Sequence, residues 1–267
     1  MKPFLRARTE EQIECRKNEI VAACETVYFR GGYDAVTFKA ISDLTSFTRP
    51  SIYNYYSTPG EVMLDLMARH FVDWREDVRR GIASEGRVSR ERFCDILADT
   101  MVRNDGLFRL WTDLNLIEGG SAVGRIAEFE RSFHELVEAV VGFASGCFPK
   151  TGDGDLERFS KALIIMLHGY HQFNHPSEKQ MEAMEACGIP TGRDPRGCAR
   201  DILMLITSGF EGRPRPLGRS PRTGCRKACC RSPPRLGAPR ACPARRCSPP
   251  SRRVLGPSRV SWTGDGR

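Results

Sequence analysis

The sequence of 267 residues lacks any apolar run that approaches the roughly 20 residues a membrane-spanning helix requires. Its first 20 residues carry charges where a secretory signal would have an apolar core. We therefore expect a cytoplasmic protein with no membrane partner. Motifs of common enzyme classes are also missing. There is no glycine-rich phosphate loop, nucleophile elbow or His-Glu-x-x-His pair. This predicts that the protein is not an enzyme and requires no cofactor.

Acidic residues are almost absent from the C-terminal end. Residues 213–267 contain 14 arginines, one lysine, one aspartate and ten of the 17 prolines. The remaining 212 residues carry 26 basic and 32 acidic side chains, so the chain's net charge of +8 originates in this tail. Because such a composition cannot bury enough apolar surface to fold, we expect the tail to be disordered.

Three interpretations of the tail remain open. It is an arm that binds DNA without sequence preference through phosphate contacts, a metal-binding segment, or a frame-shifted end of the gene. The metal interpretation would use the tail's cysteines, whose spacing matches no usual zinc motif, Cys225, Cys229, Cys230, Cys242 and Cys247. We favour the frame shift, since the residues are those of GC-rich codons.

Helical periodicity covers the rest of the chain, without the alternation of half-buried strands, and predicts an all-α fold. A first helix is expected over residues 9–30, and a long one begins at Pro59. Glycine, proline or Asx residues separate the later segments. These are residues 89–103, 107–118, 123–142, 155–175, 178–186 and 196–210.

Residues 37–56 form the most informative stretch, TFKAISDLTSFTRPSIYNYY. Two short helical patterns flank a polar break; the first has an apolar face of Ala40, Ile41 and Leu44. The second has Ile52 and Tyr56 four residues apart. Thr48 is placed to cap the second helix, with Pro50 in its first turn. This pattern predicts a helix-turn-helix whose second helix exposes Arg49, Ser51, Tyr53, Asn54 and Tyr55.

The flanking motifs make the comparison specific. Phe29-Arg30-Gly31-Gly32-Tyr33 precedes Thr37, and Tyr53-Asn54-Tyr55-Tyr56 ends the second helix. With these motifs, residues from about 13 to 74 resemble the DNA-binding domain of TetR-family transcriptional regulators. Two positions depart from the family pattern: Pro59 replaces a phosphate-binding lysine, and Ser46 replaces a turn glycine.

The resemblance implies a sequence-specific regulator, most often a repressor, that binds double-stranded DNA as a homodimer and is released by a small-molecule effector. Residues 1–58 would form a three-helix DNA-binding domain, and residues 59–212 a larger helical domain for effector binding and dimerisation. The residues that would contact DNA are Thr37, Thr48, Arg49, Pro50, Ser51, Tyr53, Asn54 and Tyr55. Bound to DNA, the protein would be associated with the nucleoid. The alternative is an architectural protein that binds DNA non-specifically through the basic tail.

Two segments near the C-terminal end, residues 156–167 and 202–210, are apolar nearly all round. A helix of this kind must be buried on all sides. We therefore expect both to lie in a bundle shared between two subunits, which is also what the resemblance implies.

Two candidate ligand sites follow from residue chemistry. Aromatic and polar residues typical of a pocket wall recur between residues 108 and 134, although plain core would give the same pattern. They are Phe108, Trp111, Asn115, Phe129, Phe133 and His134. Separately, His168, His171 and His175 share one helix face and could hold a metal ion, with Glu178 or Cys187 as a further ligand. A metal-sensing regulator is thus a further alternative; ordinary hydrogen bonding is the other use of these histidines.

Overall fold

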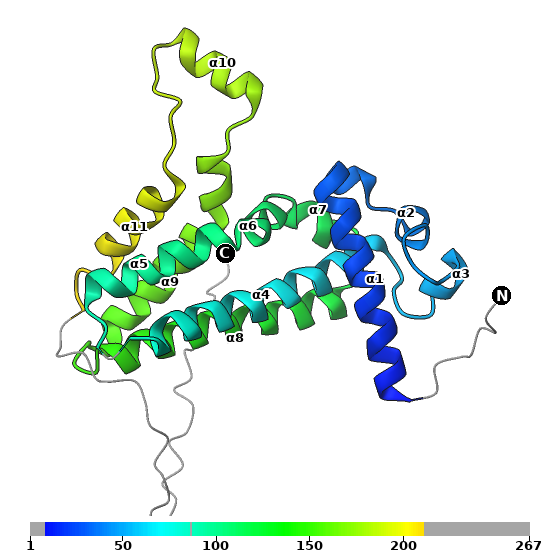
Figure 1. Ribbon diagram of the computed structural model, residues 1–267, viewed down its shortest axis with the longest axis horizontal. Helices are drawn as coiled ribbons and strands as arrows, with labels where there is room; N and C mark the ends of the chain where they lie inside the picture. Colours follow the sequence, from blue (N-terminus) through cyan, green and yellow to red (C-terminus); the bar gives the residue numbers. More distant parts are fainter. Residues whose placement is uncertain (1–8, 86, 211–267) are drawn as a thin grey trace, which may run out of the picture. The chain divides into compact units, whose positions relative to one another are not determined.

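A computed structural model of the protein describes residues 9–85 and 87–210 (Figure 1). Regular structure within these residues consists of helices only, which confirms the all-α prediction. They are α1 (Glu10–Gly31), the 3-10 helix η1 (Tyr33–Ala35), α2 (Phe38–Ser42), α3 (Arg49–Ile52), α4 (Pro59–Ala83), α5 (Arg90–Arg103), α6 (Asp105–Thr112), α7 (Leu114–Gly119), α8 (Val123–Cys147), α9 (Asp153–Asn174), α10 (Glu178–Ala186) and α11 (Pro195–Ile206). The interpretations of the tail concern residues outside this description.

Several helices begin where a side chain satisfies a free backbone N–H. Thr9, Thr37, Thr58 and Ser89 each occupy an N-cap and accept a hydrogen bond from the backbone N–H three residues later. Helix α1 ends with Gly32 as its C-cap. The φ of Gly32 is 74°, a backbone conformation that would strain a residue with a side chain. Local sequence thus determines these boundaries.

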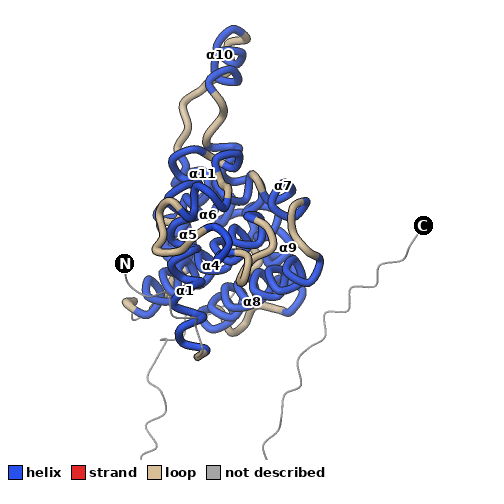
Figure 2. Tube along the Cα trace, turned by 90° about the vertical axis from the view of Figure 1, so that its right-hand side faces the viewer, coloured by secondary structure: helices blue, strands red, loops and turns tan. Residues whose placement is uncertain are grey.

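Helix α4 is the central element of the core. One stripe of apolar side chains at helical spacing is buried along it: Val62, Met63, Leu66, Met67, Phe71, Trp74 and Val78. It packs against α1, α5, α7 and α8, and α8 runs beside it over much of its length (Figures 1 and 2). The indole N–H of Trp74 donates to Oγ1 of Thr100 on α5 at 3.0 Å, so this buried polar group is satisfied.

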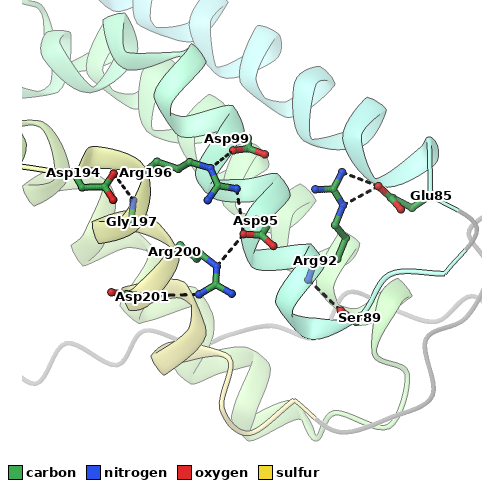
Figure 3. Close-up of polar contacts among 10 residues, drawn as sticks. All are labelled: Glu85, Ser89, Arg92, Asp95, Asp99, Asp194, Arg196, Gly197, Arg200 and Asp201. Atoms are coloured by element: carbon green, nitrogen blue, oxygen red, sulfur yellow. Dashed lines mark hydrogen bonds and ion pairs between the residues drawn. The ribbon is translucent and has the colours of Figure 1, made fainter.

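Helix α11 is held on α5 by ion pairs as well as by apolar packing. Arg196 contacts Asp99 at 2.6 Å and Asp95 at 3.2 Å, and Arg200 contacts Asp95 at 2.9 Å (Figure 3). Beneath them, Thr207 lies fully buried, with its Oγ1 3.3 Å from Sγ of Cys94. The last described helix therefore has a defined position on the fold.

Some predicted boundaries are wrong. The helix expected over residues 107–118 is two helices, broken at Asp113, whose carboxylate accepts a hydrogen bond from Tyr28 of α1. The break expected at residues 104–106 is confined to Asn104, and α8 continues five residues past 142. Leu44, assigned to the apolar face of the first helix of the motif, is exposed because it lies beyond the end of α2.

Helices α9 and α11 are not buried on all sides within one chain. Ile165 is 74% exposed and Leu205 72%, and Phe173 and Ile202 are also exposed. Nearby, α10 contributes no buried residue. Among the described residues, no helix combines the length and the apolar character that crossing a bilayer requires.

Candidate DNA-binding site

The helix-turn-helix is anchored from below by buried apolar side chains. Ile41 of α2 and Ile52 of α3 are fully buried, and Phe47 in the turn and Tyr56 after α3 are nearly so. The Tyr56 hydroxyl donates to Oδ2 of Asp65 on α4 at 2.7 Å. Burial and this carboxylate both raise the pKa of Tyr56, so its hydroxyl remains protonated and keeps the bond. The end of the motif is therefore joined to the long helix.

Contacts with α1 fix the turn between the two helices. The backbone N–H of Ser46 donates to Oε1 of Glu19 at 2.6 Å, and the guanidinium of Arg16 lies 5.1 Å from the centre of the Phe47 ring. Ser46 stands where the family usually has glycine. In this chain the hydrogen bond from Ser46 to Glu19 ties the turn to α1 and so restrains its conformation.

The opposite surface carries the groups suited to DNA. Arg49, Pro50, Tyr53 and Asn54 are exposed, as are Thr37 and Thr48, and Tyr55 is half-buried. The Tyr53 ring packs edge-on against Phe38 of α2 at 4.8 Å, and the Arg49 guanidinium donates to the Tyr53 hydroxyl at 3.4 Å. These contacts hold a guanidinium, which suits a guanine edge or a phosphate, next to a phenol.

Two details differ from the prediction. Ser51 is only 9% exposed, and its hydroxyl lies 3.0 Å from Oγ1 of Thr48. Ser51 lies next to Ile52 on the buried side of α3. Thr48 does occupy the N-cap, but its side chain makes no capping bond to the backbone. Lys39, which the sequence reasoning did not select, is exposed two residues after Thr37.

The base of α1 is linked to α6 and α7. The Tyr28 hydroxyl lies 2.7 Å from Oδ2 of Asp113 and 3.1 Å from the carbonyl oxygen of Arg109. The Arg109 guanidinium stacks over the rings of Tyr28 and Phe29, at 5.4 and 5.6 Å. A Cβ at Gly106 would lie 2.8 Å from the Phe29 ring, so α6 approaches α1 as closely as its backbone allows. Movement of α6 must therefore affect α1.

The predicted pocket residues are only partly brought together. Trp111, Phe129 and Phe133 cluster around Phe71, with ring centres 5.4–5.8 Å from it. Phe108 instead packs against Trp74 and Tyr170. Asn115 and His134 are exposed, which corrects their assignment to the wall. Each lies on the outer side of its helix, and His134 pairs with Glu138.

A cleft of about 380 Å³ lies between α1, α4 and α8 and was not predicted. Its lining combines apolar side chains with charged ones from all three helices, among them Lys17, Asp65, Arg69, Arg75, Glu135 and Phe71. Phe71 also belongs to the aromatic cluster, so the two features adjoin. Their residues are distant in sequence, and no local pattern could have identified the cleft.

The predicted histidine cluster is corrected in one member. His171 and His175 lie together, with ring centres 4.3 Å apart, and their third neighbour is Asp105 of α6. His168 faces away from them: its Nδ1 lies 2.8 Å from the carbonyl oxygen of Ile164, and its ring packs on Trp111. The spacing alone would put positions 168 and 171 on one helix face, but the His168 ring lies against Trp111 of α6 and Phe133 of α8, away from Asp105. Among the described residues, neither Glu178 nor Cys187 belongs to the group.

Comparison with known proteins identifies the family. A family profile described as the C-terminal domain of tetracycline-repressor-like proteins matches residues 68–214, more than half of the chain. The chain therefore belongs to the TetR family, a class of DNA-binding transcriptional regulators. The match covers the half of the chain that carries none of the helix-turn-helix motifs. It therefore supports the family assignment independently of them.

Solved structures show the same fold at low sequence identity. A protein of unknown function from Rhodococcus sp. RHA1 is 15% identical, with a TM-score of 0.51 over 79% of this chain and 99% of the other. A TetR-family transcriptional regulator from Mesorhizobium loti MAFF303099 is also 15% identical, with a TM-score of 0.50 over 75% of this chain and 98% of the other. A comparison with functionally curated proteins gives no match.

Proposed function

We propose that the protein is a homodimeric repressor that binds a near-palindromic operator and is released by a small-molecule effector. In this proposal residues 1–58 read DNA, and residues 59–212 bind the effector and the partner subunit. One observation carries it above all. In a chain of this family, the turn and α3 bury Phe47 and Ile52 while Arg49 and Tyr53 face outward.

The proposed DNA contacts divide by chemistry. Arg49 and Asn54 have the donor groups for base edges, whereas Thr37, Thr48, Tyr53 and Tyr55 offer hydroxyls to phosphate oxygens. Pro50 would contact the sugar-phosphate backbone by shape. Ser51 would act from below, by orienting Thr48 through their hydroxyl contact. Pro59 stands where the family has a phosphate-binding lysine and carries no charge. The exposed Lys39 is a candidate to make that phosphate contact instead.

Dimerisation through α9 and α11 would cover the apolar side chains that one chain leaves exposed. A groove of about 380 Å³ between these helices is lined mainly by apolar groups, including Ala162, Ile165, Met166, Gly169, Phe173 and Ile202. Ile165 and Phe173 would otherwise contribute a continuous apolar patch to the surface. A second copy suits this face because two half-sites require two recognition helices.

An effector site beside the aromatic cluster is supported by an unsatisfied polar group. The Trp111 side chain is 4% exposed, and its Nε1 has no hydrogen-bond partner among the described residues. A buried N–H without a partner costs roughly 1–3 kcal/mol. An acceptor oxygen of a bound effector would recover that free energy. We therefore place the effector against Trp111, Phe129 and Phe133.

Selection from a random DNA library with the full-length protein tests the function. The expected product is a near-palindrome with half-sites about one helical turn, roughly 34–36 Å, apart. Recovery of unrelated sequences, bound equally well, would show that the protein binds DNA without reading it. That result would favour the architectural alternative.

A further inference from the structure

Three side chains from two helices meet at the start of α6. Nδ1 of His171 lies 3.0 Å from Oδ1 of Asp105, and Nε2 of His175 lies 3.3 Å from the same oxygen. The three ligand-type atoms all lie within 4.8 Å of one another. Asp105 and His171 are 66 residues apart in sequence, so the arrangement is produced by the packing of α6 on α9.

The separations are those of a metal site. A tetrahedral Zn²⁺ ion with bonds of about 2.0–2.1 Å has ligand atoms about 3.3 Å apart. Both distances from Asp105 are already close to this value. His171 and His175 have the i, i+4 spacing with which one helix presents two imidazoles to zinc. Three protein ligands leave a fourth position for water or another ligand.

The surroundings hold the ligands in place and leave them accessible. Asn104, which precedes Asp105, donates from its side chain to Asp77 of α4 at 2.8 Å and to the Thr100 carbonyl at 2.9 Å. The side chain of His171 is 14% exposed, whereas Asp105 and His175 are 37% and 44% exposed. An ion can therefore enter from solvent without unfolding α6.

We propose that Asp105, His171 and His175 form a Zn²⁺ site that joins α6 to α9 and adjusts DNA binding. The second part of the proposal rests on the regulatory function proposed above, whereas the first part does not. Its structural basis is the residue after Asp105: Gly106 packs against the Phe29 ring of α1. An ion that fixes Asp105 to α9 restrains the start of α6, and through Gly106 it restrains α1, the helix that supports the helix-turn-helix.

Zinc binding is tested first, without DNA, on the full-length protein. Accessible cysteines are alkylated beforehand, because the tail thiols would otherwise compete as ligands. Calorimetric titration with Zn²⁺ should give one equivalent per chain. Asp105→Asn, His171→Gln and His175→Gln each remove a ligand and should weaken binding by more than the roughly 10–100-fold that losing an outer-shell partner costs. Titration with Co²⁺ should show d–d bands without thiolate charge transfer.

His168→Gln is the matched control, since it removes an exposed imidazole from the same helix outside the group. It should change zinc affinity less than about twofold. Circular dichroism verifies that each variant folds. If Asp105→Asn does not fold, the zinc affinity of His175→Gln decides whether the site exists, because His175 is exposed at the end of α9 and its loss should not disturb the fold. Absence of Zn²⁺ binding by the alkylated wild type, or unchanged binding by His171→Gln and His175→Gln, would overturn the site.

The regulatory part is tested by fluorescence anisotropy with the selected duplex. Zn²⁺ should shift the wild-type affinity for DNA at least fivefold, DNA should shift zinc affinity by the same factor, and His171→Gln should abolish both effects. Equal DNA affinity with and without Zn²⁺ would refute the coupling. Failure to bind the duplex in either condition would refute the regulatory function and leave the zinc site intact.

Discussion

Replacement of Tyr28 by phenylalanine tests the connection between α1 and the helices below it. Tyr28 is 1% exposed, and its hydroxyl donates to the Asp113 carboxylate at 2.7 Å. Phenylalanine keeps the ring and removes only the contacts of the hydroxyl, which are this bond and the longer one of 3.1 Å to the carbonyl oxygen of Arg109. Hydrogen bonds to charged groups contribute about 1.5–3 kcal/mol. Because Asp113 is half-buried and regains some hydration, we expect a loss near the lower end of this range.

Equilibrium unfolding in urea measures the effect, at one protein concentration because an oligomer's stability depends on it. Tyr53→Phe is the matched control: Tyr53 is 52% exposed, and the substitution should change stability by less than about 0.5 kcal/mol. A double-mutant cycle with Asp113→Asn should give a coupling of at least about 1 kcal/mol. Equal stability of Tyr28→Phe and Tyr53→Phe would refute the role assigned to this bond.

Three further predictions concern the interface, the thiols and helix packing. The wild type is expected to be dimeric in sedimentation equilibrium and Ile165→Asp monomeric, because the substitution puts a charge into the proposed interface; a dimeric variant would exclude that face. Cys15 is exposed and should react with iodoacetamide in the folded protein. Burial raises the pKa of Cys24 to about 12, so Cys24 should react only after unfolding. Mass spectrometry after timed alkylation distinguishes the two thiols. Gly60→Ala should lower the free energy of unfolding, measured in urea, by about 1–3 kcal/mol, because the new Cβ would lie 2.7 Å from a backbone carbonyl oxygen. Gly142→Ala on α8 is the control: its Cβ would meet no atom, and the substitution should be neutral or stabilising.

Much of the fold could be predicted because its signals are local. Ser89 caps α5, Gly32 ends α1, and the apolar stripe of α4 recurs at helical spacing. The break at Asp113 could not be predicted in this way. The break accompanies a hydrogen bond that Asp113 accepts from Tyr28, 85 residues earlier in the chain, and the neighbouring sequence does not indicate this contact.

The candidate sites divide along the same line. Exposure of Arg49 and Tyr53 follows from the pattern of residues 37–56. The burial of Ser51 could not be predicted, because the four residues of α3 are too few for spacing to define its inner face. The histidine spacing located two of the three ligands of the proposed metal site, His171 and His175. Asp105 could not be found, since it comes from another helix and only tertiary packing brings it to His171.

The most direct test of the proposed function is binding of the full-length protein to its selected duplex and to a scrambled duplex, over a range of salt concentrations. We expect the wild type to prefer the selected duplex, and Arg49→Ala to lose at least about tenfold in affinity for it while remaining folded. Binding through the basic tail alone would be strongly salt-dependent and equal for both duplexes. Equal affinities of wild type and Arg49→Ala, or of the two duplexes, would contradict the proposal that this helix-turn-helix reads DNA.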